Sequence, residues 1–254
     1  MTTGFWPMRT KYFPREYAVR MVQAWALDRE RGFFGEFFPL AMSKQAMQTF
    51  HTDVDSSFGY TPDTAYFTLI GMFRQHLGDP AWRLTLNHLQ HYNYCEAWGL
   101  PVAPEAYDRS GHPFGDQYSN FNAGKILLYL EGLAGVEYSI PDNVFRVCDT
   151  MPTDWDWMEL RLPIRKAGNA QTVWTGVRFD RKTIGGRVIK SVRVSESPLR
   201  VTIEPWLEER LLAGPAILRG GEAVVQPSPP PGHAGYTFAK ATPNTVSVEV
   251  TLGN

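Results

Sequence analysis

The chain has 254 residues, of which 43% are hydrophobic and 20% are charged, and its formal net charge is -1. These values are typical of a globular protein with one large domain or two modest ones. The charge gives no electrostatic reason to expect nucleic acid or an anionic membrane as a partner, and no apolar run is long enough to span a bilayer.

Residues 1–155 are predicted to be mainly helical. Apolar residues recur at helical spacing from Arg15 to Arg29, and Gly32 follows as a stop signal. Thr61 and Pro62 predict the start of another helix, with Thr61 as its N-cap and Pro62 in its first position. Three further helices are predicted over Leu40–Met47, 80–92 and Asn122–Leu133. Paired helices joined by loops indicate a helical bundle or toroid.

Residues 156–254 are predicted to form a second, β domain. Short segments rich in β-branched residues alternate there with turn signals, which favours a small antiparallel sandwich. The predicted strands are Met158–Ile164, Gln171–Phe179, Val188–Val194, Leu199–Trp206, Glu222–Val225 and Thr245–Leu252.

The cysteines predict neither a disulfide framework nor a zinc site, because Cys95 and Cys148 lie far apart and outside any CxxC motif. Buried free thiols suit a reducing compartment. The segment Met1–Met8 lacks the basic start and apolar stretch of a signal peptide. We therefore expect a cytoplasmic protein.

The segment between two predicted helices carries the strongest functional signal. It begins with Glu105-Ala106-Tyr107-Asp108, continues through a short glycine-containing loop, and ends with Phe121-Asn122-Ala123-Gly124 ahead of an apolar helix. A carboxylate held among aromatic and glycine residues on an interhelical loop suits glycoside hydrolysis, which requires an acid and a base.

This pattern resembles the catalytic-base region of the six-hairpin (α/α)6 glycosidases, above all glycoside hydrolase family 63 and the trehalase-like family 37. The resemblance implies a partial (α/α)6 toroid of helical hairpins followed by a C-terminal antiparallel β-sandwich. It also implies inverting hydrolysis of oligosaccharides or glycosides, with Glu105 as the base and Tyr107 as its aromatic neighbour. The chain has fewer helical hairpins than the resemblance implies, and no upstream segment matches the family's acid. We therefore expect a C-terminal portion whose partner is the missing N-terminal half of the same enzyme.

Other residues are candidates for binding a carbohydrate substrate. Carboxylates on predicted loops could bind sugar hydroxyls, although turn formation is the competing interpretation for each. Aromatic rings could pack against sugar rings, although burial in the core competes there. The candidates are Asp53, Asp55, Asp108 and Asp116 among the acids, and Tyr107, Tyr118, Phe121, Phe37 and Trp98 among the aromatics. Glu36 is an alternative acid.

Two other functions remain open at this level. The chain could be a non-catalytic carbohydrate-binding or scaffold protein that keeps the base and lacks the acid. It could also be a polysaccharide lyase that uses Tyr107 and His112. No cofactor or metal is predicted, because His88 and His91 have no carboxylate to complete a ligand set and no Gly-rich phosphate or dinucleotide motif is present.

Overall fold

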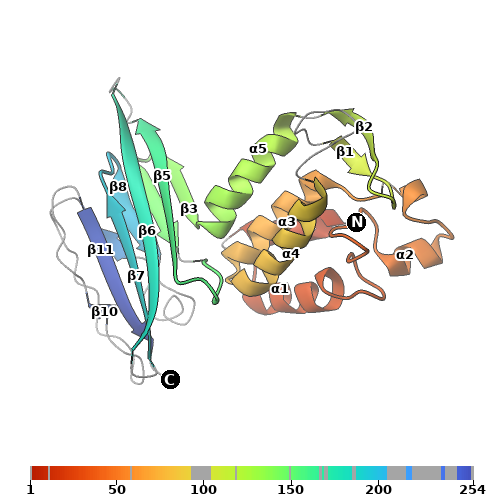
Figure 1. Cartoon of the computed structure of the whole chain (residues 1–254), viewed down its shortest axis with the longest axis horizontal. Coiled ribbons are helices and arrows are strands. Elements are labelled where there is room, and N and C mark those ends of the chain that lie inside the picture. The colour runs from red at the N-terminus through yellow and green to blue at the C-terminus, as the bar shows by residue number, and fades with distance from the viewer. Residues whose placement is uncertain are drawn as a thin grey trace. The chain divides into compact units, whose positions relative to one another are not determined.

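The computed structural model of the protein describes residues 2–10, 12–57, 59–92, 104–117, 119–148, 150–165, 168, 171–184, 187–204, 216–218, 236–237 and 245–252. The chain divides into two compact units, Met1–Leu133 and Ala134–Asn254 (Figure 1). This division lies upstream of the expected domain boundary between residues 155 and 156.

The first unit combines helices with one β-hairpin. Its elements are the 3-10 helix η1 (Thr2–Arg9), α1 (Arg15–Met21), the π-helical turn η2 (Val22–Ala26), α2 (Lys44–Thr49), the 3-10 turn η3 (Asp55–Ser57), α3 (Pro62–Arg74), α4 (Gly78–Tyr92), β1 (Pro104–Tyr107), β2 (Pro113–Gln117), α5 (Ser119–Leu127) and the π-helical η5 (Leu128–Leu133). Strands β1 and β2 pair antiparallel. None of the described helices has both the length and the apolar character needed to cross a membrane.

Helix α3 lies at the centre of this unit. It packs against η1, α4, α5 and η5 (Figure 1). Most of its described side chains are buried, including Leu69, Ile70 and Phe73, each 0% exposed, whereas Phe67 and Arg74 are half-buried. A helix with so wide a buried surface is stable only when several neighbours cover it. The predicted start is confirmed, since Thr61 is the N-cap and Pro62 the first helical residue. The Thr61 hydroxyl, however, contacts the Thr64 hydroxyl rather than a backbone amide.

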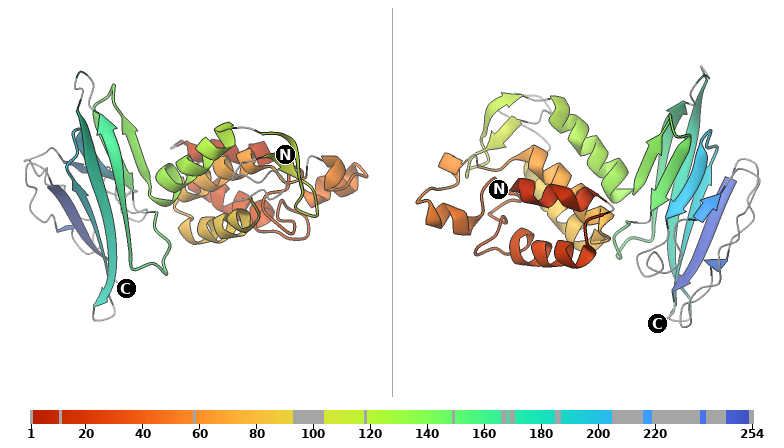
Figure 2. Two further views of the ribbon diagram at one scale, coloured as in Figure 1. Left: turned by 45° about the horizontal axis from the view of Figure 1, so that its top comes forward. Right: turned by 180° about the vertical axis from the view of Figure 1, so that it is seen from behind.

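The second unit contains two sheets. A five-stranded antiparallel sheet has the order β10-β11-β7-β6-β5, and a four-stranded sheet has the order β3-β4-β8-β9 (Figure 2). Strands β4 and β8 are parallel, whereas the other pairs are antiparallel. The bounds are β3 Val136–Ser139, β4 Val144–Cys148, β5 Trp157–Arg165, β6 Thr172–Ile184, β7 Arg187–Ser195, β8 Arg200–Glu204, β9 Ala216–Leu218, β10 Tyr236–Thr237 and β11 Thr245–Leu252.

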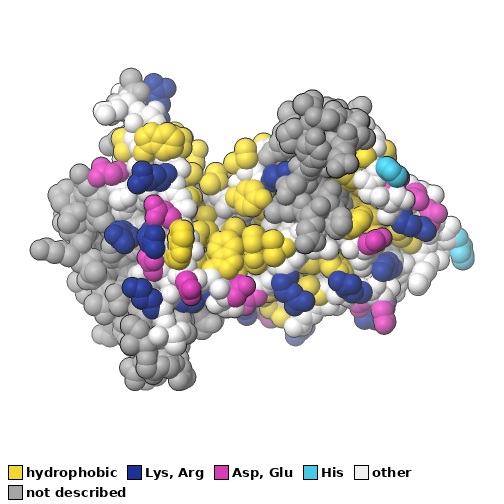
Figure 3. Space-filling view, in the orientation of Figure 1, with side chains coloured by type: hydrophobic (Ala, Val, Ile, Leu, Met, Phe, Trp, Pro, Cys, Tyr) yellow, Lys and Arg dark blue, Asp and Glu magenta, His cyan; other side chains and the backbone are white. Residues whose placement is uncertain are grey.

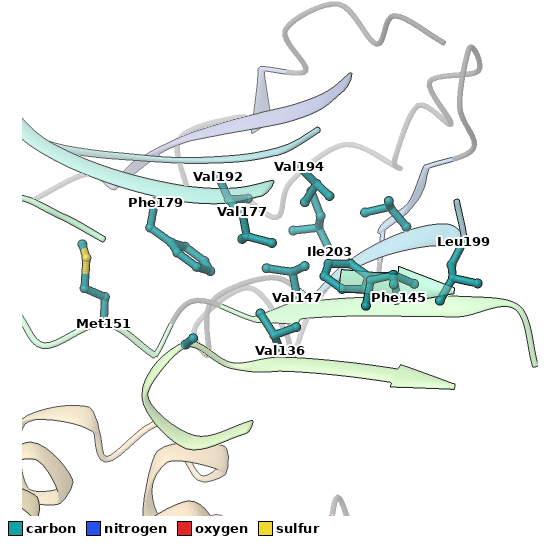
Figure 4. Packing of buried hydrophobic residues seen from close by; sticks show 13 residues of the cluster. Val136, Phe145, Val147, Met151, Val177, Phe179, Val192, Val194, Leu199 and Ile203 are labelled. Atoms are coloured by element: carbon teal, nitrogen blue, oxygen red, sulfur yellow. The ribbon is translucent and has the colours of Figure 1, made fainter. Parts of the chain in front are cut away.

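One apolar core joins the two sheets (Figure 4). Phe145 and Val147 of β4, both 0% exposed, belong to the same buried cluster as Val177 and Phe179 of β6. Alternate residues of each strand therefore point into the core, and the residues between them point away from it.

The predicted fold class is wrong. The structure is mixed, and its described residues form a small helical unit with a β-hairpin, not an (α/α)6 toroid. The supposed interhelical loop at Glu105 is strand β1, and β3 and β4 lie in a segment that was predicted to be helical. The strands following β4 are not all antiparallel neighbours, because β8 pairs parallel with β4. The four strands β1 to β4 have only four or five residues each, which is too short for their alternation to be distinguished from a helical pattern.

The longer strands agree with the sequence. Strands β5, β6 and β7 contain most of the predicted strands Met158–Ile164, Gln171–Phe179 and Val188–Val194, and β11 spans the predicted Thr245–Leu252. The predicted strand Glu222–Val225 lies outside the described residues.

Replacing Phe145 tests the shared core of the second unit. Phe145→Ala removes a fully buried ring and is expected to lower the free energy of unfolding of this unit by about 3–5 kcal/mol. Arg146→Ala is the control, because the neighbouring side chain is exposed and should change stability by no more than about 0.5 kcal/mol. Urea unfolding followed by circular dichroism measures both, and equal losses would contradict the core assignment.

Candidate functional site

The hairpin that carries Glu105 is fixed to the segment that leads into α3. The Tyr60 amide donates to the Tyr107 carbonyl at 2.9 Å, and the Tyr107 amide donates to the Tyr60 carbonyl at 3.0 Å. Gly59, with φ of 53°, allows this approach, since a Cβ there would overlap the Tyr107 carbonyl oxygen. Two backbone hydrogen bonds and a close packing contact therefore set the position of β1.

Glu105 is half-buried on β1, at an irregularity between Pro104 and Ala106 where the register with β2 shifts. Its side chain lies over Gly115 of β2, and a Cβ at position 115 would come within 2.7 Å of the Glu105 Cβ. Gly115 also has a φ of 77°, which favours glycine. The irregular strand and the glycine opposite it together leave room for the carboxylate on this side of the hairpin.

Buried aromatic rings support the hairpin. Phe37, Tyr60 and Tyr107 form one cluster with Leu40 and Met47, and the ring centroids of Phe37 and Tyr60 are 4.9 Å apart. Phe37 is 7% exposed and Tyr107 is 2% exposed. Phe37 and Tyr107, which were predicted as substrate contacts, therefore present almost no surface to a ligand and instead belong to the buried cluster that holds β1.

Two of the candidate acids join a neighbouring loop to the hairpin turn. Asp55 Oδ1 accepts a hydrogen bond from the Arg109 amide at 2.8 Å, and Asp53 Oδ2 lies 4.0 Å from Arg109 Nη2. Asp53 Oδ1 also accepts from the Ser56 amide at 2.9 Å. Hydrogen bonds from Ser56 lower the pKa of Asp53, desolvation opposes them, and the nearby charge of Arg109 adds to the lowering.

Asp108 organises the turn itself. Its Oδ1 accepts hydrogen bonds from the amides of Ser110 and His112, both at 2.8 Å, and its Oδ2 lies 3.4 Å from His112 Nδ1. Desolvation raises the pKa of Asp108, but the amide hydrogen bonds of His112 and Ser110 outweigh it, so the net pKa is lowered. Asp53 and Asp108 are therefore stable carboxylates and poor proton donors at neutral pH.

The structure brings Asp53, Asp55 and Asp108 to one end of the hairpin that carries Glu105. Sequence reasoning missed Tyr60 and Arg109, which make the contacts between these segments. Tyr60 stands directly before the predicted N-cap, and that position was the only signal available for it. Glu36, the alternative acid, is exposed, and its amide donates to the Tyr60 hydroxyl at 3.1 Å.

Four of the predicted residues have no described side chain. Trp98 and Tyr118 lie outside the described residues, and Asp116 and Phe121 are placed only as backbone positions on β2 and α5. Within the described part of the chain, no group of three or more His, Cys, Asp or Glu residues is placed to hold a metal ion.

Comparison with known proteins does not assign the chain to a family. No protein-family model matches the chain, and no curated protein matches it.

The hairpin attachment can be tested with a pair of glycine variants. Gly59→Ala is expected to destabilise the first unit and to detach β1, because the new methyl group would overlap the Tyr107 carbonyl oxygen. Gly111→Ala is the matched control. Gly111 also has positive φ, but open space surrounds it, so only the conformational cost of about 1–2 kcal/mol applies. Hydrogen exchange of the Tyr60 and Tyr107 amides measures the attachment, and equal exchange in both variants would contradict it.

The turn should lose stability in acid. Because folding lowers the pKa of Asp108, its contribution is complete above the ordinary value of 3.8 and is lost as the pH falls through the lower folded value. The difference in unfolding free energy between wild type and Asp108→Ala should therefore shrink below pH 3.8. Denaturant titrations across this range measure the difference, and a pH-independent Asp108→Ala difference would contradict the assignment.

Proposed function

We propose that this chain takes part in glycoside hydrolysis, with Glu105 as the general base of an inverting two-carboxylate mechanism. The observation that carries the proposal is the position of Glu105, which is half-buried on a strand fixed to the core by the Tyr60–Tyr107 pair. A base must be held at a defined position relative to the sugar, and rigid strands provide this more precisely than loops. The proposed substrate is a carbohydrate.

The chemistry assigned to Glu105 is proton removal from water. The carboxylate takes a proton as the water oxygen attacks the anomeric carbon from the face opposite the leaving group. A second carboxyl group, about 6.5–9.5 Å away in such enzymes, protonates the departing oxygen. Gly115 is compatible with this role because any side chain at position 115 would overlap the Glu105 carboxylate.

The neighbouring aspartates suit a supporting role better than that of the acid. An acid must carry a proton at the working pH, and the lowered pKa values of Asp53 and Asp108 oppose this. Asp55 accepts a hydrogen bond from the Arg109 amide. We therefore assign these three carboxylates to holding the turn, and we assign the acid to none of them.

The lyase alternative receives less support. A lyase base must reach the sugar, and the Tyr107 side chain proposed for it is buried in the aromatic cluster while His112 is exposed. The alternative of a non-catalytic carbohydrate-binding protein involves the same class of ligand, and it predicts binding without turnover.

Replacement of Glu105 tests the base. Glu105→Ala should lower turnover of a cleavable aryl glycoside by about 10²–10⁴-fold, because water must then attack the anomeric carbon without a base to take its proton. Added azide should restore turnover in this variant and yield a glycosyl azide of inverted configuration, since azide needs no base. Product formation is followed by release of the aryl group and by proton NMR of the anomeric centre.

The control for this experiment is Glu137→Gln, which alters another half-buried glutamate on a strand and should leave turnover unchanged. Full activity in folded Glu105→Ala would overturn the assignment. Loss of activity without azide rescue would restrict Glu105 to a structural role.

A further inference from the structure

The outer side of the five-stranded sheet carries two exposed tryptophans. Inward residues of β5, β6 and β7, such as Ile164, Val177 and Val192, are buried in the core, so the residues between them point away from it. Among these outward residues, Trp157 is 57% exposed and Trp174 is 62% exposed. Large exposed aromatic side chains on one face are typical of binding surfaces.

The strand register gives the spacing of the two rings. Trp174 is paired with Pro163 of β5, and Trp157 lies on that same strand. Six residues of β strand span about 20 Å. The two tryptophans therefore lie at the two ends of a long track along the sheet, too far apart to line one small pocket.

The middle of this track is held in place by ion pairs. Arg178 donates to Asp180 at 2.8 Å and to Glu159 at 3.0 Å, and its guanidinium lies 5.0 Å from the Trp157 ring centroid. These contacts offset the Arg178 charge and fix its position beside Trp157. Gly176, opposite Arg161, adds no side chain and keeps the surface low.

Other cations on this side form no ion pair with a described residue. They are Arg161, Arg193 and Lys182, which point away from the core, and each is exposed. Figure 3 shows basic, acidic and hydrophobic side chains interspersed over β5 and β6. We name this surface the Trp–Arg face, defined by Trp157, Trp174, Arg161, Arg178 and Arg193.

We propose that the Trp–Arg face binds an acidic polysaccharide whose sugars carry carboxylates. Tryptophan rings pack against the apolar side of sugar rings, and arginine pairs with carboxylates through two parallel hydrogen bonds. An extended polymer matches a track bounded by two separated rings. The choice of a carbohydrate rests on the proposed function, whereas its acidic character rests on the exposed cations of this face.

Single-stranded nucleic acid fits the Trp–Arg face less well. Such ligands stack successive bases on closely spaced aromatic rings within a strongly basic groove. Here the two tryptophans are about 20 Å apart by strand rise, and the whole chain has a net charge of -1.

Calorimetric titration of the full chain with polygalacturonate, neutral dextran and oligothymidylate tests the proposal. Polygalacturonate should bind, and dextran and oligothymidylate should bind at least tenfold more weakly. Trp174→Ala and Trp157→Ala should each weaken polygalacturonate binding by about tenfold. Tyr138→Ala, which removes an exposed aromatic from β3 of the other sheet, should leave binding unchanged. Arg161→Ser combined with Arg193→Ser should reduce both the affinity and its dependence on salt.

The outcomes separate this proposal from that for Glu105. Glu105→Ala should bind polygalacturonate like wild type, and Trp174→Ala should keep full turnover of a small aryl glycoside. Polygalacturonate binding that survives both tryptophan replacements would overturn the assigned face. Absence of binding, or tighter binding of oligothymidylate, would overturn the assigned ligand whatever the activity of Glu105.

Discussion

The first unit depends on the burial of most of the α3 surface. A helix buried to this extent is stable only when η1, α4, α5 and η5 cover it together, so the position of each of these segments depends on α3. Tyr60 lies two residues before Pro62, the first residue of α3, and its backbone pairs with Tyr107. The packing of α3 thus fixes Tyr60, Tyr60 fixes β1, and β1 fixes Glu105.

The aromatic and acidic residues around the hairpin have different structural roles. Phe37 and Tyr107 carry large rings, yet both are buried in the cluster that packs β1 against the rest of the unit. Asp55 and Asp108 carry carboxylates, yet both accept backbone amides and shape the turn. Glu105 lies on strand β1 itself, over Gly115 of β2. The proposed chemistry therefore rests on one carboxylate, and its neighbours provide rigidity.

The sequence predicts features that depend on local patterns. Thr61 and Pro62 locate the start of α3, and long alternating runs locate β5, β6, β7 and β11. Features that depend on distant contacts were missed. The strand at Glu105 is held in place by the pairing of Tyr107 with Tyr60, and the residues next to Glu105 give no sign of this distant partner. Clustering of Asp108 with Glu105 was foreseeable from their proximity in the chain, whereas the approach of Asp53 and Asp55 through Arg109 was not.

The parallel pairing of β4 with β8 has a consequence for how the second unit forms. Val144 pairs with Arg200, so the partner strand of β4 lies much later in the sequence, after β5, β6 and β7. Closing such a long loop costs entropy before any contact compensates for it, and folds of this kind form slowly. A chain shortened before β8 would leave β4 with an open edge and Phe145 with part of its core missing. The unit should therefore fold only after nearly all of its strands have been synthesised.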